Sequence, residues 1–403
     1  MAYESLTHIY YTNPEKLEEE YMRRFDSPST LHFDIGIKQY NRKKTYPAFM
    51  CFTNEMVNLI EEIFASQAAL LKILPKIPIV LLQQYSLLCI VNEVKSSNDI
   101  EGVHSTRREI REALDNIGSK TRFESTINKY MMIVEHSDIP LETCNDIRKT
   151  YDDLVHAEVI NENPQNELDG VIFRKGSVDI TSETGKTIHR GLFPEQAIIE
   201  AMDKALAILN DDSYSMLIRS ALFHYMFAYI HPFYDGNGRT GRFIATYTLS
   251  KTLIRAISMR LSLTTKKQIK KYYKLFAEAD SEINHGDLTP FVLGFLEIIK
   301  QAAADAYTLL QRKLTQFNNN IEILKSLSDD PTTIDIYTTL FQASILYGQG
   351  LPAEKIAAAI DKSKNTVLNR LKAIPQTHLV INTINRKKHY KLNLLILKEY
   401  SSR

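Results

Sequence analysis

The stretch that decides the fold reads His231-Pro-Phe-Tyr-Asp-Gly-Asn-Gly-Arg-Thr-Gly-Arg242. Apolar residues recur with helical spacing on both sides of it: Leu217, Ala221, Tyr225 and Tyr229 before it, and Phe243, Ile244, Tyr247 and Thr248 after it. The sequence therefore predicts a tight loop between two buried helices. The end of the loop should form the first turn of the second helix.

The glycines and arginines of this loop suit a polyphosphate ligand. Gly236 and Gly238 allow positive φ angles and let the backbone N–H groups approach a ligand closely. The N-terminus of the following helix adds partial positive charge. Arg239 and Arg242 lie three residues apart, so both should project from one side of the first turn, where guanidinium groups suit phosphate oxygens.

Two further side chains of the loop bring metal and proton chemistry. Asp235 lies beside the predicted anion site and can hold a Mg²⁺ ion that bridges phosphate oxygens and offsets their charge. His231 is the only side chain of the loop that is both largely neutral at pH 7 and able to accept a proton. A turn alone needs neither the histidine nor the two arginines. The combination therefore predicts phosphoryl or nucleotidyl transfer.

The whole stretch resembles the signature of the Fic family, His-Pro-Phe-x-Asp/Glu-Gly-Asn-Gly-Arg-x-x-Arg, and agrees with it at every fixed position. The resemblance implies a mainly α-helical, Fic-type core that transfers AMP from ATP, with Mg²⁺, to a hydroxyl of a target protein. It also implies the site roles: His231 as general base, Asp235 as Mg²⁺ ligand, Gly236, Asn237 and Gly238 as phosphate cradle, and Arg239 and Arg242 as contacts of the distal phosphates.

A second informative stretch, residues 93–102, precedes the loop by more than a hundred residues. Gly102 is a good residue to follow a helix end, and Glu101 would then lie in the last turn, where the helix dipole disfavours a carboxylate. Glu101 should therefore have a positively charged partner. Ser97, Glu101 and Gly102 resemble the Fic inhibitory motif, Ser/Thr-x-x-x-Glu-Gly/Asn, of family members that carry it N-terminal to the signature. That resemblance implies a contact between Glu101 and Arg242.

From Gly170 the pattern changes to the period of a β-strand. Apolar residues alternate with polar ones on both sides of Ser182-Glu-Thr-Gly-Lys186, and this pattern predicts a β-hairpin. The apolar residues of the pattern are Val171, Phe173, Val178, Ile180 and Ile188. The Fic resemblance implies that this hairpin is a flap on which an extended segment of the target docks. An open strand edge can pair with the backbone of almost any sequence. A purely structural hairpin is the alternative.

The last part of the chain is a basic module. From Pro331 onward there are eleven Lys and Arg against four Asp and Glu, a net charge of +7, whereas the whole chain carries +1. Helical patterns at 333–345, 352–360 and 365–374 precede β-prone residues 380–384 and a charged tip, Arg386-Lys-Lys388. The order resembles a winged helix-turn-helix, with Lys362, Lys364 and Arg370 on or near its recognition helix. Contact with DNA and docking of a protein both remain open.

The remaining features bound the class of protein. The 44% hydrophobic and 24% charged residues are ordinary for a soluble protein, and the most apolar region, residues 73–91, contains prolines and a lysine that argue against a membrane span. The three cysteines lack CxxC spacing and the start resembles no signal peptide, which predicts a cytoplasmic location. Residues 1–50 look polar and irregular.

The predicted organisation has four parts. An N-terminal helical region, 1–112, carries the inhibitory motif, and a Fic catalytic core follows at 113–305. A linker helix at 306–330 leads to the winged-helix domain at 331–403. The Fic resemblance covers roughly residues 50–305.

The sequence thus leads to the hypothesis of an autoinhibited protein adenylyltransferase that modifies Tyr, Thr or Ser hydroxyls of a target and of itself. Two alternatives remain: removal of AMP from modified targets by the same site, and a nucleotide-sensing, DNA-binding regulator. The identity of the target, the base of the nucleotide and the formation of a homodimer are left open by the sequence.

Overall fold

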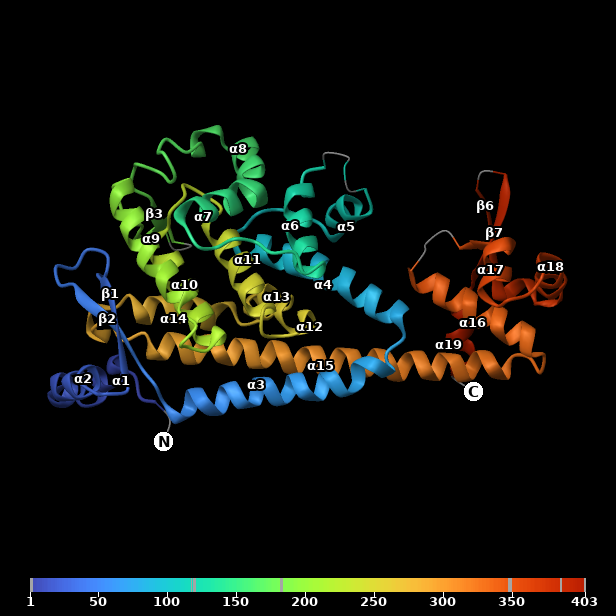
Figure 1. Ribbon diagram of the computed structural model, residues 1–403, viewed down its shortest axis with the longest axis horizontal. Helices are drawn as coiled ribbons and strands as arrows, with labels where there is room; N and C mark the ends of the chain where they lie inside the picture. Colours follow the sequence, from blue (N-terminus) through green and yellow to red (C-terminus); the bar gives the residue numbers. More distant parts are fainter. Residues whose placement is uncertain are drawn as a thin grey trace. The chain divides into compact units, whose positions relative to one another are not determined.

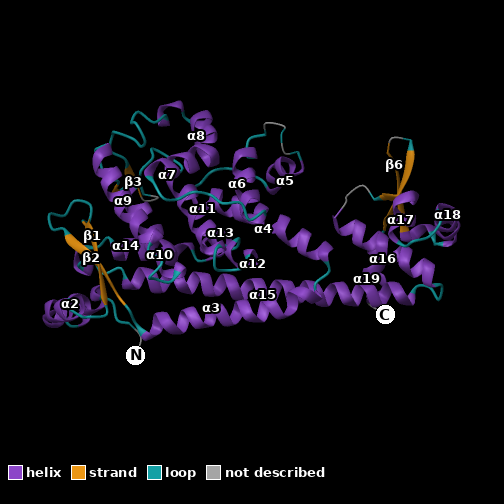
Figure 2. Ribbon diagram, in the orientation of Figure 1, coloured by secondary structure: helices purple, strands orange, loops and turns teal. Residues whose placement is uncertain are grey.

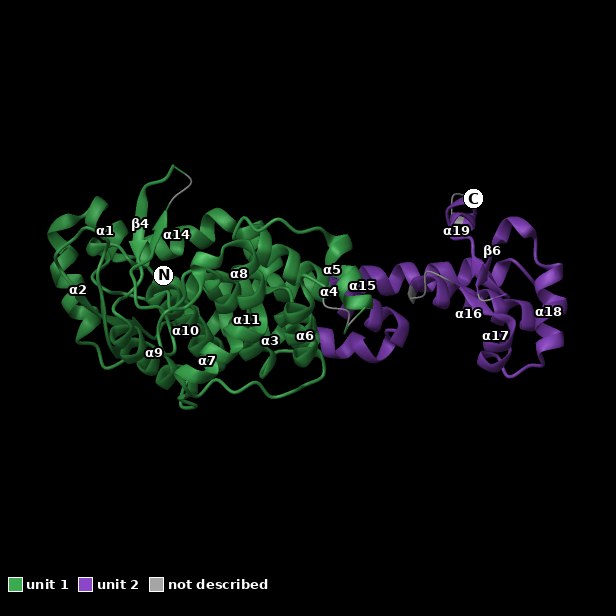
Figure 3. Ribbon diagram, turned by 90° about the horizontal axis from the view of Figure 1, so that it is seen from above, with its two compact units in different colours: residues 1–69, 89–306 green, residues 70–88, 307–403 purple. Residues whose placement is uncertain are grey.

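A computed structural model describes residues 3–116, 118, 121–181, 184–346, 350–384 and 386–401. The chain forms two compact units, residues 1–69 with 89–306 and residues 70–88 with 307–403 (Figure 3). The prediction of a mainly α-helical fold is confirmed, since helices dominate both units and the described sheets have only two or three strands. No helix of the described residues combines the length and the apolar character needed to cross a membrane.

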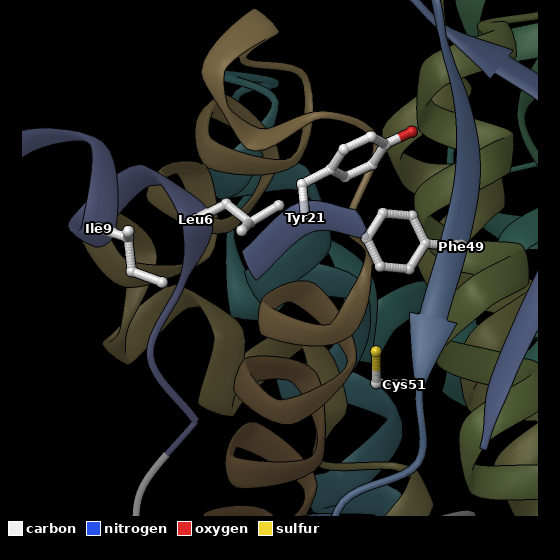
Figure 4. Packing of buried hydrophobic residues seen from close by; sticks show 5 residues of the cluster. All are labelled: Leu6, Ile9, Tyr21, Phe49 and Cys51. Carbon is white, nitrogen blue, oxygen red and sulfur yellow. The ribbon is translucent and has the colours of Figure 1, made fainter. Parts of the chain in front are cut away.

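The N-terminal segment of the first unit is more ordered than the sequence suggested. It forms α1 (Leu6–Thr12), α2 (Leu17–Phe25) and an antiparallel hairpin of β1 (Thr30–Ile37) and β2 (Tyr46–Cys51). The expectation of an irregular segment therefore missed this β-hairpin. A small cluster made of Leu6, Ile9, Tyr21, Phe49 and Cys51 packs these elements together (Figure 4). Burial of these scattered side chains stabilises elements that are too short to be recognised by their periodicity.

Two long helices follow, and prolines separate them. Helix α3 (Asn54–Ile73) ends before Pro75, a 3₁₀ turn covers Leu74–Lys76, and α4 starts at Ile79, directly after Pro78. Helix α4 ends at Ile100, and Gly102 follows with a φ of 72°. Helices α5 (Arg107–Asp115), α6 (Glu124–Val134), α7 (Cys144–Tyr151) and α8 (Ala157–Glu162) come next, and a π-helical turn at Asp152–His156 joins the last two.

The centre of the first unit is a pair of packed helices, α10 (Met216–Ile230) and α11 (Asn237–Ser250) (Figure 1). Almost every residue of both is buried, because helix α9 (Glu195–Asn210) and further elements surround them. Short helices α12 (Arg255–Ser258), α13 (Leu261–Lys267) and α14 (Ile269–Ala279) lead to α15. The two buried helices flanking the glycine-rich loop are those that the sequence predicted.

Two predicted elements have different bounds. The hairpin starts later than Gly170, since its strands are β3 (Asp179–Thr181) and β4 (Thr187–Arg190), and residues 170–178 form bends. These bends are held by side chains: Glu195 accepts hydrogen bonds from the N–H groups of Val171, Ile172 and Phe173. The predicted linker helix at 306–330 is the second part of one continuous helix, α15 (Thr289–Ser326).

The described residues of the C-terminal part of the second unit form four α-helices and a three-stranded antiparallel sheet (Figure 2). The first three helices are α16 (Pro331–Leu346), α17 (Ala353–Ala359) and α18 (Lys364–Ala373), close to the predicted spans. Strands β5 (Leu351–Pro352), β6 (Leu379–Ile384) and β7 (Lys387–Leu392) pair in the order β5-β7-β6, and α19 (Leu395–Ser401) follows. This element order is the one the sequence suggested for a helix-turn-helix followed by a hairpin.

Candidate active site

The glycine-rich loop begins with a left-handed residue and ends with another. His231 caps helix α10 with φ 53° and ψ 63°, and its N–H donates to the carbonyl of Phe227 at 3.0 Å. Gly236, with φ 80°, is the residue before helix α11. Left-handed conformations at both ends reverse the chain within a few residues, so His231 and the N-terminus of α11 belong to one tight turn.

Asn237 holds this turn closed. Its Oδ1 accepts a hydrogen bond from the N–H of Phe233 at 2.9 Å, and its Nδ2 donates to the carbonyl of Phe233 at 2.7 Å. The side chain is 3% exposed. The sequence placed Asn237 in the phosphate cradle, but its amide group is occupied inside the loop, so only its backbone N–H is in a position to serve an anion.

Replacing Asn237 with alanine should therefore loosen the loop. The change leaves the N–H and the carbonyl of buried Phe233 without their partners, and each such loss costs about 1–3 kcal/mol. We expect a lower midpoint of urea unfolding. We also expect weaker ATP binding, because the loosened loop would hold its backbone N–H groups less firmly. Asn58→Ala, on the exposed surface of helix α3, is the matched control. Equal unfolding midpoints for the two variants would contradict the role given to Asn237.

The two glycines of the cradle are required for different reasons. At Gly236 the positive φ is the reason, and a Cβ there would also lie 2.9 Å from the Cγ2 of Val155. Gly238 has an ordinary helical conformation, contrary to the expectation of a positive φ. A Cβ at Gly238 would lie 2.0 Å from Oε1 of Glu101. Gly238 therefore leaves open the space beside the helix N-terminus that the Glu101 carboxylate fills.

His231 is held as a neutral imidazole. Its carbonyl accepts hydrogen bonds from Nε and Nη2 of Arg174, at 3.0 and 2.7 Å, and its Nδ1 lies 3.4 Å from the carbonyl of Ala228. Burial, together with the neighbouring His189 and Arg174, lowers the pKa of His231 from 6.5 to about 3. The ring therefore carries no charge at pH 7. If Nδ1 bears the proton and donates to Ala228, the lone pair on Nε2 can accept one.

Asp235 fits the role of a metal ligand by its chemistry and its exposure. Its carboxylate is 42% exposed, accepts a hydrogen bond from the N–H of Gly236, and has Arg239 at 4.0 Å. Among the described residues, no three His, Cys, Asp and Glu side chains are grouped to bind a metal. A hard cation at Asp235 would therefore complete its oxygen shell from phosphates and water.

The two arginines point to different partners, although the sequence placed them on one side of the first turn. Arg239 is 3% exposed, and its Nη1 lies 3.1 Å from Oε2 of Glu158, at the start of helix α8. Its Nε and Nη2 are buried and form no hydrogen bond within the described part of the chain. Burial raises the pKa of Glu158, and Arg239 and Arg122 oppose that effect. Arg239 thus retains donors that a ligand oxygen could satisfy.

Arg242 is bound by the end of helix α4. Its Nη1 lies 2.8 Å from Oε1 of Glu101, its Nε donates to Oγ of Ser97 at 3.0 Å, and its Nη2 donates to the carbonyl of Ser97 at 3.0 Å. The guanidinium is 2% exposed and the Glu101 side chain 30%. The contact that the sequence resemblance implied between Glu101 and Arg242 is present. The structure thus brings Ser97, Glu101 and Gly102 to the loop from a segment far away in sequence.

Two buried groups that the sequence did not single out support this contact. Glu93 of helix α4 accepts hydrogen bonds from Oγ1 of Thr246 at 3.0 Å and from the N–H of Ser262 at 2.9 Å, which fixes α4 against α11. Burial raises the pKa of Glu93. Tyr272 of helix α14 bonds to Arg242 and, at 2.7 Å, to buried His224. The signal in the sequence that could have identified Glu93 is its charge within an otherwise apolar stretch of helix.

Comparisons with known proteins agree with this geometry. Residues 146–249 match the Fic/DOC family. Over 88 residues the chain is 35% identical to a protein adenylyltransferase Fic of Nematostella vectensis, and over 97 residues it is 36% identical to that of Drosophila melanogaster. These alignments cover 22% and 24% of this chain and 18% of each relative, so the chain matches less than a fifth of those proteins.

The similarity in structure extends further than the similarity in sequence. A Fic family protein from Desulfovibrio desulfuricans G20 superimposes with a TM-score of 0.52 and 19% identity, covering 85% of this chain and 97% of that one. At such low identity the match concerns the fold alone. It supports a Fic-type helical fold for the chain, with the family's sequence match at residues 146–249.

Proposed function

We propose that this chain, whose residues 146–249 form a Fic domain, is a protein adenylyltransferase that moves AMP from ATP to a Tyr, Thr or Ser hydroxyl of a target protein and of itself. One observation carries the proposal. A single turn holds a neutral histidine and the glycine-lined N-terminus of helix α11, with two buried arginines on the first two turns of that helix. This arrangement places a proton acceptor beside a site for phosphates.

The residues of the turn divide the reaction between them. The oxygen of the target hydroxyl attacks the α-phosphorus of ATP, its proton passes to His231, and pyrophosphate leaves. Backbone N–H groups at the N-terminus of α11 and the guanidinium groups of Arg239 and Arg242 bind phosphate oxygens. Transition states of this kind are loose, so positioning and neutralisation of charge supply most of the rate enhancement.

Asp235 would hold a magnesium ion, which would supply positive charge to offset that of the phosphates. Replacing Asp235 with alanine should therefore remove most of the Mg²⁺-dependent part of ATP binding, about a tenfold change, which corresponds to about 1.4 kcal/mol. Titration calorimetry with and without Mg²⁺ measures it. Asp212→Ala, in an exposed turn, is the control for the loss of one carboxylate. An unchanged Mg²⁺ dependence in Asp235→Ala would refute the assigned role.

In the same proposal, Glu101 inhibits the enzyme. Its carboxylate occupies one donor of Arg242 and fills the space beside Gly238, where distal phosphates would otherwise lie. A carboxylate and a phosphate compete for the same guanidinium donors. The wild-type chain should consequently bind ATP in an unproductive manner or weakly, and activation should require movement of Glu101.

Labelled nucleotides in cell lysate test the proposed function. Glu101→Gly should transfer label from ATP labelled at the α-phosphate to lysate proteins, and no label from ATP labelled at the γ-phosphate. Transfer of the γ-label would instead indicate a kinase. Absence of both labels, from a folded variant at saturating ATP and Mg²⁺, would overturn the proposal. Competition by unlabelled GTP, CTP and UTP would show which base the site prefers.

Removal of AMP by the same site is a second candidate, which the position of Glu101 favours. Its partly exposed carboxylate lies next to the phosphate cradle, where it could orient a water molecule for attack on a phosphodiester. Chain that has been auto-modified by Glu101→Gly can serve as substrate. Under this candidate, added wild-type chain releases AMP from it and Glu101→Gly does not.

A role for the C-terminal module in binding DNA is less supported by its contacts. Lys364 lies 2.7 Å from Glu354 and Arg370 lies 3.0 Å from Asp330, so two of the three cations assigned to a recognition helix are in ion pairs. Lys362 is exposed. We retain in the proposal a winged-helix module that docks a protein. The alternative of a nucleotide-sensing regulator predicts that no AMP is transferred in the labelling experiment, whereas the enzyme transfers it.

A further inference from the structure

The end of helix α10, which carries the proposed base, is capped by the segment that contains the β3–β4 hairpin. The last carbonyl groups of a helix lack partners within the helix and must be satisfied from outside. Here the carbonyl groups of four consecutive residues, 229 to 232, all accept hydrogen bonds from residues between Arg174 and Leu192. The hairpin and the base are therefore joined by a continuous set of hydrogen bonds.

The donors come from both ends of the hairpin. On the entering side, Arg174 donates from its side chain to the carbonyl of His231 and from its N–H to that of Pro232, the latter at 3.3 Å. On the leaving side, the N–H of Leu192 donates to the carbonyl of Ile230 at 3.0 Å. The positive charge of Arg174 is also favourable at the negative end of the helix dipole.

The third donor, His189, lies within strand β4. Its Nε2 is 2.7 Å from the carbonyl of Tyr229, and since a carbonyl only accepts, this nitrogen bears a proton. Its Nδ1 lies 3.3 Å from Oδ2 of Asp280, whose Oδ1 accepts from the hydroxyl of Tyr225 at 2.7 Å. His189 is only 6% exposed. Asp280 thus fixes the orientation of the ring, and the ring fixes the strand to the helix.

The geometry of a strand makes the contact of His189 sensitive to the register of β4. Successive side chains of a strand point to opposite faces, so His189 points inward while Ile188 and Arg190 point outward, and both of these are exposed. A shift of the strand by one residue would exchange the two faces. Within strand β4, the buried imidazole of His189 is therefore the side chain that holds the register of the strand relative to Tyr229, two residues before His231, and the Leu192 bond to Ile230 continues this attachment after the strand.

We propose that His189 is a positioning residue, which registers the hairpin, and any target segment docked on its edge, against the base His231. The inference rests on the proposed function, because it gives the hairpin a target to place. If the docked segment shifted along the strand by less than the spacing of one residue, its acceptor hydroxyl would already lie outside the reach of His231. The binding of ATP in the cradle of α11 would not change.

The test uses Glu101→Gly as the active parent. In this background, His189→Ala should lower the transfer of α-label to lysate proteins at least about tenfold, equivalent to about 1.4 kcal/mol. The KM for ATP and the slow hydrolysis of ATP to AMP and pyrophosphate should stay near the parent values, because water needs no docking on the hairpin. Hydrogen exchange should become faster in peptides covering 186–193 and 226–233.

Asp280→Asn is the conservative variant. An asparagine at this position can still accept from Tyr225 and donate to Nδ1 of His189, so the proton on Nε2 and the bond to Tyr229 are retained. It should keep transfer within about threefold of the parent, a change of less than about 1 kcal/mol. His8→Ala, on the exposed surface of helix α1, controls for loss of a histidine.

The outcomes separate this inference from the proposed function. Transfer by His189→Ala at the parent rate, or unchanged exchange at 186–193 and 226–233, would overturn the positioning role alone. A parallel loss of ATP hydrolysis and transfer, with Asp280→Asn equally impaired, would show general damage to the fold and would also overturn it. A parent that labels no protein would instead overturn the proposed function.

Discussion

Replacing His231 with alanine is expected to lower AMP transfer by at least about a hundredfold, the lower range for loss of a general base. The fold of the loop should survive the change. The contacts that hold the loop use the backbone of His231 and the side chains of Arg174 and Asn237, and none of them needs the imidazole. ATP binding should stay near the wild-type value, because the phosphates contact helix α11 and its arginines.

Transfer rates and titration calorimetry in the Glu101→Gly background distinguish a base from a structural residue. Loss of transfer with ATP affinity preserved supports the base. His231→Gln, which keeps polarity but accepts no proton at neutral pH, should be as inactive as the alanine variant. Full activity in either variant would remove His231 from the mechanism.

The pH profile gives a second view of His231. Since its pKa is lowered to about 3, the ring is neutral at any pH well above that value and protonates only below it. The transfer rate should therefore not fall on acidification as it would with an ordinary histidine as base. With the ordinary pKa of 6.5, the rate would be halved near pH 6.5.

Replacing Glu101 with glycine is expected to have the second largest effect, in the opposite direction. Arg242 is 2% exposed and donates its hydrogen bonds to Ser97, Glu101 and Tyr272, so a phosphate can reach it only by displacing one of them. Glu101 is the most exposed of the contacts from α4 and the only charged one. Its removal should raise auto-modification at least about tenfold, which needs a gain of only about 1.4 kcal/mol.

Two companion variants show whether the effect passes through Arg242. Glu101→Gln keeps the size of the side chain but removes its charge, and should be activated less than the glycine variant. The double variant with Arg242→Ala should lose the activation, because the arginine is then unable to hold a phosphate. Auto-modification of Glu101→Gly at the wild-type rate, at saturating ATP and Mg²⁺, would contradict the inhibitory role of Glu101.

Much of this site could be predicted from the sequence because its chemistry is concentrated in one loop. Twelve consecutive residues contain the base, the carboxylate and both arginines, and the flanking helical periodicity is unambiguous. The boundary between α3 and α4 was also predictable, since Pro75 and Pro78 act through local geometry. The contact of Glu101 with Arg242 was foreseen only through a family resemblance, because nothing in the spacing of the two residues brings them together.

Features that depend on tertiary contacts were missed or misjudged. The side-chain amide of Asn237 bonds both backbone groups of Phe233, a fit that composition does not reveal. The β1–β2 hairpin has a register shift between His32 and Gly36 that interrupts its alternation. The caps on α10 come from residues about forty to sixty positions earlier in the chain, and only the fold shows that His189 faces Tyr229. Long-range partners of this kind leave no local pattern.

The intact mass of the purified chain tests the central claim most directly. Glu101→Gly incubated with ATP and Mg²⁺ should gain the mass of one or more AMP groups and release pyrophosphate in equal amount. The double variant Glu101→Gly with His231→Ala should keep its original mass under the same conditions. A gain of phosphate mass, an unchanged mass in Glu101→Gly, or equal AMP addition in the double variant would contradict the assignment of His231 as the base of an adenylyltransferase.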